Sequence, residues 1–366
     1  MTFNPARLSV ARQRRLLNQK GFAELVGLST KTISRYEKGL NEPDEDAIDR
    51  FVAALGFPRA FFFGDKIEFP NAELVSFRSQ KAMTAAVRDA ALSAGALGFL
   101  VSDWIEERFS LPGIDLPDLQ LSAAAPEAAA RAVRAEWAMG EQPVTNMIHL
   151  LEAHGVRVLS LAENSVRVNA FSMWRDEKPY VFLNTIKSAE NSRFDAAHEL
   201  GHLVLHQDGK PTGRVAEDQA NRFASAFLMP GADVLAHVGE VYSLDQMIRL
   251  KRRWKVSLAA LNYRLHKVGV TTDWGYRDFC IQLSTLGYNK REPQPIERER
   301  SIVWEKILKL LWNDKKTFRV ISEELDLPES EVSAFIYGVL SGGDKPSPSP
   351  ESGLTLVQSA IPGTLY

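Results

Sequence analysis

The sequence of 366 residues contains a single cysteine, Cys280, which excludes an internal disulfide and a cysteine-based zinc finger. Its apolar neighbours predict that this cysteine is buried. The longest hydrophobic run, residues 90–101, is interrupted by Ser93 and is too short to cross a bilayer. The N-terminus is rich in arginine and lacks the apolar core, about 7–15 residues long, of a signal peptide. These absences predict a cytoplasmic protein that does not enter a membrane.

The chain also has almost no excess charge. Its 44 basic and 46 acidic residues leave a formal net charge of −2, which excludes a uniformly basic protein that packages nucleic acid. Hydrophobic residues make up 45% and charged residues 25%, which excludes a wholly disordered or collagen-like chain. A chain of 366 residues is too long for one minimal domain and predicts two or three.

Composition and periodicity divide the chain into five stretches. We predict an all-α domain at residues 1–66, an Ala-rich helical linker, packing or dimerisation region at 67–140, an α+β domain at 141–270, a helical region at 271–345 and a flexible Pro/Ser tail at 346–366. The expected fold class is therefore a multidomain chain with an all-α N-terminal domain, an α+β domain and a helical C-terminal region.

The predicted α+β domain contains both strand and helix patterns. Short runs rich in β-branched and aromatic residues predict strands at 156–161, 169–174 and 180–183. Longer helical patterns follow at 188–206 and 215–229, the second stopped by a Pro-Gly pair.

Two short helical patterns near the N-terminus are joined by a glycine. Asn18 is placed to cap the first helix, and Gly27 supplies a tight turn after it. The inward face of this helix is predicted to carry Phe22, Leu25 and Val26.

The second of these helices is predicted at residues 30–38, with Ser29 as its N-cap. Its outward positions are polar or basic: Lys31, Thr32, Ser34 and Arg35. Residues 1–40 hold eight basic residues against two acidic ones, a local excess of six positive charges. Two short helices with a basic outer face on the second are what a reader of the DNA major groove needs.

Residues 7–63, with the run ELVGLSTKTISRYEKG, resemble the helix-turn-helix domain of phage-repressor and Xre type. The resemblance implies binding to a double-stranded DNA operator. It implies backbone contacts from Gln19 and Lys20, and groove contacts from Thr30, Lys31, Thr32, Ser34 and Arg35. Domains of this type commonly bind two half-sites as dimers, so a homodimer is expected.

A metal-binding pattern, His-Glu-Leu-Gly-His, occupies residues 198–202. Because His198 and His202 are four residues apart, they lie on one helix face and both can reach one cation. Glu199 is offset by about 100° around the helix axis, so it can reach a water at the site and act as general base. Two nitrogens and a carboxylate with an open fourth position suit Zn²⁺, one ion per chain.

The helix pattern that follows offers a third ligand. Glu217 and Asn221 lie four residues apart at the edge of its apolar face, so we predict Glu217 as the ligand and Asn221 as a residue that orients a ligand or the helix. A third histidine six residues beyond His202 is excluded, because Asp208 is there. His206 is predicted to be a structural histidine at the helix end. The alternative is that Glu217 is an ordinary surface carboxylate and the histidines are structural.

The runs RFDAAHELGHLVLH and EDQANRFASAFLMP resemble the ImmA/IrrE family of metallopeptidases. The resemblance implies a zincin-like metallopeptidase domain at 141–270 and a zinc-dependent endopeptidase with a narrow protein substrate. Some members of this family act as antirepressors or stress switches by cutting a helix-turn-helix repressor, so the expected partner is a repressor or antitoxin. A donor to the reaction oxyanion is also expected, and Tyr242, Tyr263 and His266 are candidates.

Two functions remain open from the sequence. The first is a transcription regulator whose zinc endopeptidase cuts a regulatory protein. The second is an Xre-type regulator whose metallopeptidase-like domain senses a ligand or metal without proteolysis, as in related regulators of short-chain fatty-acid metabolism. The retained Glu199 favours the enzyme, because a site freed from catalysis could lose it and still bind metal. The acidic segment 318–340 predicts a solvated helical hairpin or dimerisation element rather than a second DNA contact.

Overall fold

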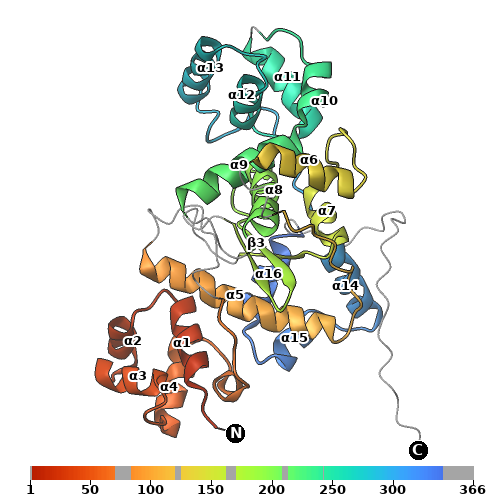
Figure 1. The fold of residues 1–366 in the computed structure, drawn as a ribbon. Helices are drawn as coiled ribbons and strands as arrows, with labels where there is room; N and C mark the ends of the chain where they lie inside the picture. The colour runs from red at the N-terminus through yellow and green to blue at the C-terminus, as the bar shows by residue number, and fades with distance from the viewer. Residues whose placement is uncertain are drawn as a thin grey trace, which may run out of the picture.

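The computed structural model describes residues 2–70, 84–119, 125–161, 170–207, 213–241 and 243–340. These residues form a helical N-terminal domain, a small mixed sheet with helices, and a helical C-terminal region (Figure 1), as predicted for the fold class. The predicted tail, residues 346–366, and the candidate Tyr242 lie outside the described residues.

The N-terminal domain consists of α1 (Pro5–Arg14), α2 (Gln19–Val26), α3 (Thr30–Glu37), α4 (Glu45–Leu55) and the 3-10 helix η1 (Arg59–Phe63). The side chain of Asn18 accepts a hydrogen bond from Gly21 N at the start of α2, and Gly27 ends that helix with a φ of 66°. The prediction that Leu25 faces inward is wrong, because its side chain is 58% exposed. Phe22 and the residues one and four positions after it form the buried face, which leaves Leu25 about 100° to the side.

Helix α5 (Ala85–Glu106) lies between the N-terminal domain and the sheet (Figure 1). Gln13 of α1 accepts a hydrogen bond of 2.8 Å from Ser93 of α5. On the other side a β-carbon at Gly98 would lie 2.7 Å from the Phe182 ring, so only glycine allows this approach to the sheet. Among the described helices, α5 is the one long and apolar enough to span a membrane, but 67% of its most apolar window is buried inside the protein. It is therefore the core helix that joins the domains.

The sheet contains β1 (Arg157–Ser160), β2 (Phe171–Arg175) and β3 (Lys178–Leu183) in the order β1-β3-β2. β1 runs parallel and β2 antiparallel to the central β3. Successive side chains point to opposite faces of a strand. Phe171 therefore faces α5, near Gly95, while Ser172 and Trp174 contact α8 (Ala189–Leu205). Helices α5 and α8 thus cover the two faces of the sheet.

Further helices pack beyond α8: α6 (Pro126–Glu136), α7 (Met147–Ala153), α9 (Arg214–Leu228), α10 (Gly231–His237), α11 (Leu244–Trp254), α12 (Leu258–Lys267) and α13 (Asp273–Thr285). The crossing of α8 and α9 is set by Gly201. A β-carbon there would lie 3.0 Å from Phe223 Cδ1 and 3.3 Å from Ala220 Cα. Glycine inside a helix costs about 1 kcal/mol relative to alanine, and here it lets the two helix axes approach closely.

Cys280 on α13 is exposed, so the prediction that it is buried is wrong. The buried face of α13 carries Phe279 and Leu283 instead. The buried neighbour Phe279 does not share a helix face with Cys280, because adjacent residues are about 100° apart.

The C-terminal helices are α14 (Ile302–Asn313), α15 (Arg319–Glu324) and α16 (Glu329–Tyr337). They are not a solvated hairpin, because Val332 and Phe335 of α16 are fully buried. The buried carboxylate of Glu331 pairs with Arg14 at 2.9 Å and Arg15 at 2.6 Å, both from the end of the N-terminal domain's first helix. Helix α16 also packs against β1. Glu331 therefore serves contact between domains, which a local pattern could not reveal.

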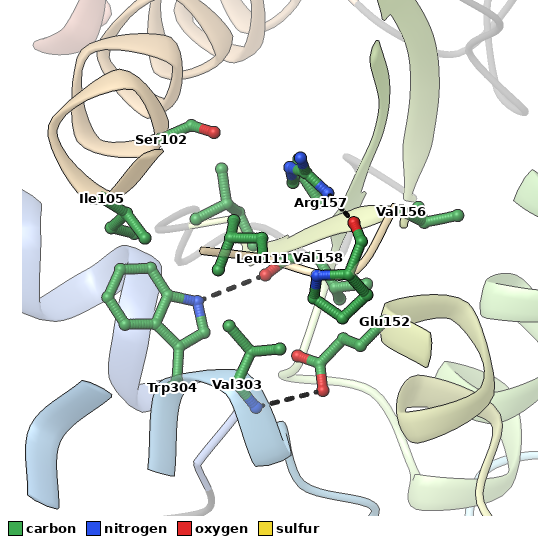
Figure 2. A pocket seen from close by; sticks show the side chains of 11 residues that line it. Ser102, Ile105, Leu111, Glu152, Val156, Arg157, Val158, Val303 and Trp304 are labelled. Atoms are coloured by element: carbon green, nitrogen blue, oxygen red, sulfur yellow. Dashed lines mark hydrogen bonds between the residues drawn. The ribbon is translucent and has the colours of Figure 1, made fainter. Parts of the chain in front are cut away.

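A cavity of about 30 Å³ lies where α5, α7, β1 and α14 meet (Figure 2). Glu152 forms part of its wall and caps α14, because its carboxylate accepts hydrogen bonds from the Ser301 hydroxyl and from the amides of Ile302 and Val303. Burial raises the pKa of Glu152 to about 7, although these hydrogen bonds act to lower it.

This raised pKa predicts a pH-dependent stability difference between the wild type and Glu152→Gln. The folded chain holds a proton on Glu152 that the unfolded chain releases near pH 4.5, so the group's stabilising contribution is lost as pH rises toward 7. Between pH 5 and 8 the wild type should lose up to about 3 kcal/mol relative to the variant. Urea-unfolding midpoints of both proteins measure this change, with the exposed Glu329→Gln as control. Parallel pH profiles for wild type and Glu152→Gln would contradict it.

Candidate metal centre and DNA-binding face

Three potential ligands converge where α9 crosses α8. His198 and His202, one turn apart on α8, are 0% and 5% exposed, and their Nε2 atoms lie 3.0 Å apart. Glu217, in the first turn of α9, places one carboxylate oxygen 3.4 Å from His198 Nε2 and the other 3.4 Å from His202 Nε2. The close packing at Gly201 brings the two helices near enough for this arrangement.

The outer nitrogens of both histidines are held by hydrogen bonds. His198 Nδ1 lies 3.1 Å from Asn221 Oδ1, and His202 Nδ1 lies 2.9 Å from His206 Nδ1. His206 Nε2 in turn lies 2.8 Å from Gln219 Oε1. Because amide oxygens only accept, this network places protons on His198 Nδ1 and on His206 Nε2, so His206 Nδ1 accepts from His202. Both Nε2 atoms point toward Glu217: in the metal-free protein they can donate to its carboxylate, and once deprotonated their lone pairs can bind a metal ion.

The charges of the group follow from the same contacts. Burial acts to raise the pKa of Glu217, but hydrogen bonds from His198 and His202 outweigh it, so the pKa falls well below its usual value. Burial, with the neighbouring His202, lowers the pKa of His206 to about 4. Glu217 is therefore ionised and His206 neutral at pH 7.

The donor set fits a tetrahedral metal ion. Ligands about 2.0–2.1 Å from a tetrahedral zinc lie about 3.3 Å apart, and the three separations here are 3.0, 3.4 and 3.4 Å. Among the described residues, this is the one group of three or more His, Cys, Asp or Glu side chains placed to share an ion. Two neutral imidazoles and one carboxylate are ligands that suit zinc.

Glu199 lies beside the first ligand and is 1% exposed. Its carboxylate accepts a hydrogen bond of 2.6 Å from the hydroxyl of Ser172, which projects from β2. Ser172 was not predicted from the sequence. The available signal was a small polar residue in the apolar strand Phe-Ser-Met-Trp, at a position that alternation assigns to the same face as Trp174.

The predicted DNA contacts lie on and beside α3. Thr30, Lys31 and Arg35 are exposed, and Thr32 and Ser34 are half-buried. Lys20 is exposed on α2, whereas Gln19 is half-buried and donates a hydrogen bond of 2.7 Å to Glu37. The structure thus presents the basic residues to solvent and holds Gln19 against the end of α3.

Models of two protein families match this chain, one over the N-terminal helical domain and one over the region that holds the candidate metal centre. Residues 6–60 match the model of a helix-turn-helix domain, and residues 151–266 match the IrrE N-terminal-like domain of peptidase family M78. The chain joins a helix-turn-helix domain to an ImmA/IrrE metallopeptidase domain. A search of curated proteins found no match.

Two of the oxyanion candidates have defined surroundings in the ImmA/IrrE domain. Tyr263 lines a cleft of about 600 Å³ whose walls also include Asn221 and Asp218. His266 instead pairs with Asp273 at 2.7 Å and stacks on Tyr276. Of these two residues, Tyr263 is therefore the better candidate for the donor to the reaction oxyanion, because it lines the cleft.

Proposed function

We propose that this protein is a cytoplasmic transcription regulator that binds operator DNA and cuts a specific regulatory protein with a zinc-dependent endopeptidase domain. The observation that carries the proposal is the convergence of His198, His202 and Glu217 beside the buried carboxylate of Glu199. The partner would be a helix-turn-helix repressor or an antitoxin, as the ImmA/IrrE resemblance implies.

The side chains have separate roles in peptide hydrolysis. His198, His202 and Glu217 would hold one Zn²⁺, which when bound supplies a Lewis acid that polarises the scissile carbonyl and acidifies water. Glu199 takes the proton of the attacking water and delivers it to the leaving amine. Ser172 holds one oxygen of Glu199, which fixes the direction of the carboxylate. Asn221 fixes the ring of His198.

The DNA-binding role rests on the exposed face of α3. Lys31 and Arg35 are exposed on this face, and Arg35 donates a hydrogen bond to Asn41. Arg residues on such a helix donate to base edges, and Lys residues neutralise phosphates. Glu37 orients Gln19 beside this face, where it can donate to the DNA backbone.

Transcript abundance in cells tests both halves of the proposal at once. Arg35→Ala and Glu199→Gln should each reproduce the transcript profile of a strain that lacks the gene. Arg35→Ala should lose operator occupancy, whereas Glu199→Gln should keep it, because the base lies far from the groove helix. The control is Arg59→Ala, because Arg59 pairs with Asp49 on the N-terminal domain, outside the predicted contacts.

The two single variants separate the alternatives. If Glu199→Gln behaves as wild type while Arg35→Ala behaves as the deletion, the metallopeptidase domain acts without proteolysis and serves as a sensor. If Arg35→Ala is silent, the helix-turn-helix domain is not the source of regulation.

A further inference from the structure

His206 is the C-cap residue of α8 and lies one turn beyond the candidate ligand His202. It is buried, and its ring centroid lies 5.1 Å from that of His202. Both of its ring nitrogens have partners: Nδ1 lies 2.9 Å from His202 Nδ1, and Nε2 lies 2.8 Å from Gln219 Oε1. The ring therefore links the candidate metal centre to the half-buried amide of Gln219 on α9.

Gln219 and the candidate ligand Glu217 flank one packed face of α9. This face carries Ala216 and Ala220, both buried. Because successive residues are about 100° apart, Glu217 and Gln219 lie about 80° to either side of the centre of this face. The face meets α8 closely, since a β-carbon at Gly201 would lie 3.3 Å from Ala220 Cα. One helix crossing thus brings Glu217 to the Nε2 atoms of the two ligand histidines and Gln219 to the end of the histidine row.

The amide oxygen at the end of this row fixes the direction of each hydrogen bond within it. A neutral imidazole carries a proton on one nitrogen and a lone pair on the other. Since Gln219 presents its oxygen, His206 carries its proton on Nε2 and accepts at Nδ1 from His202 Nδ1. His202 thus keeps a proton on Nδ1, and its Nε2 is the nitrogen that can give up a proton and bind a cation.

The reverse direction would block the metal site. A donor in place of the Gln219 oxygen would make His206 accept at Nε2 and donate from Nδ1 to His202 Nδ1. A neutral His202 would then carry its proton on Nε2, the nitrogen that faces Glu217 and that a metal ion needs. The group at position 219 therefore decides which nitrogen of His202 presents its lone pair to the site.

We propose that His206 and Gln219 are positioning residues for the metal centre, which hold the proton of His202 on Nδ1 and leave Nε2 to the ion. This inference rests on the zinc site of the proposed function, and it gives His206 a role beyond the structural one that the sequence predicts. Neither residue belongs to the three-ligand group, so their loss weakens the site without removing a ligand. Partners of this kind typically change metal affinity by roughly 10–100-fold.

Zinc affinity of the full-length protein, measured by chelator competition, tests the role of the oxygen at position 219. Gln219→Glu supplies oxygens that only accept hydrogen bonds, so it should bind zinc at least as tightly as the wild type. Gln219→Met is similar in length but offers only a weak acceptor, so its zinc affinity should fall roughly 10-fold or more. His206→Ala should fall by roughly 10–100-fold, because His202 Nδ1 loses its partner.

Gln219→Glu also adds a negative charge near the ion. The matched control is Val215→Glu, because Val215 is 57% exposed and, like Gln219, lies two residues from Glu217 on α9. Val215→Glu should leave the zinc affinity close to that of the wild type.

The ring tautomers provide a readout that does not depend on zinc. Long-range ¹H–¹⁵N NMR spectra of zinc-free, histidine-labelled protein show which nitrogen of each ring carries a proton. His206 should carry its proton on Nε2 in the wild type and in Gln219→Glu. It should lose this preference in Gln219→Met, because the acceptor that selects Nε2 is gone.

Two results would overturn the proposal. One is wild-type zinc affinity in both Gln219→Met and His206→Ala, and the other is a wild-type His206 with its proton on Nδ1. The second measurement needs no variant, so it holds even where circular dichroism shows that a variant has lost its fold. Glu217→Ala, measured in parallel, separates the two levels. If only Glu217→Ala loses zinc, the roles of His206 and Gln219 are wrong, whereas unchanged affinity in Glu217→Ala overturns the zinc site itself and this proposal with it.

Discussion

Replacing Glu217 with alanine is expected to lower the zinc affinity of the protein by more than 100-fold. Loss of a residue that only supports a ligand costs roughly 10–100-fold in metal affinity, and Glu217 supplies the sole carboxylate of the three-ligand group. Asn221→Ala should lower the zinc affinity by the smaller amount, roughly 10–100-fold. Asn221 contacts Nδ1 of His198, whereas the nitrogen of His198 that faces the metal site is Nε2. Zinc content after dialysis, followed by chelator competition, measures these affinities.

The matched control for Glu217 is its neighbour Asp218, which lines the cleft beside the site but is not in the three-ligand group. Asp218→Ala should keep wild-type affinity. Because a metal that binds only the folded state stabilises it, a chelator should lower the melting temperature of the wild type and leave that of Glu217→Ala unchanged. Retention of tight zinc by Glu217→Ala would show that another residue supplies the third ligand.

Replacing Glu199 with glutamine is expected to slow peptide hydrolysis by roughly 10²–10⁴-fold, the usual contribution of a positioned general base. Zinc affinity should be unchanged, because Glu199 is not one of the converging ligands. The amide is close in size to the carboxylate and can still accept a hydrogen bond from Ser172, so the fold should persist. Formation of new protein N-termini measures hydrolysis, and metal analysis measures bound zinc.

Ser172 supplies a graded comparison for that result. Ser172→Ala removes the hydroxyl that holds Glu199 but keeps the base, so it should slow hydrolysis less than Glu199→Gln does. Ser172→Thr keeps a hydroxyl and should restore much of the rate. Equal losses in Ser172→Ala and Glu199→Gln would mean that the serine has more than a positioning role.

Local chemistry explains which features the sequence could predict. Asn18, Gly27 and Ser29 act on backbone groups within three or four residues, and all three have the predicted capping or turn role. The strands follow runs of β-branched and aromatic residues for the same reason. The spacing of His198 and His202 on one helix likewise needs no knowledge of distant residues.

Long-range contacts explain what the sequence did not show. The local sequence predicts a solvated acidic region around Glu331, because its partner Arg14 lies 317 positions away and leaves no local signal. The role of Ser172 depends on the position of β2 over α8, and the hydrogen bond from His206 to Gln219 depends on how α9 crosses α8. Each of these residues is ordinary in its own sequence neighbourhood and becomes specific through packing.

The most direct test of the central claim is a comparison of new protein N-termini produced by two zinc-loaded proteins. Purified wild type and Glu199→Gln are each added to a lysate from cells that lack the gene, and newly formed N-termini are labelled and identified by mass spectrometry. The account predicts cuts in one or a few proteins, a DNA-binding regulator or antitoxin among them, that appear with the wild type and not with Glu199→Gln. Identical sets of N-termini from both proteins, with zinc bound in each, would contradict it.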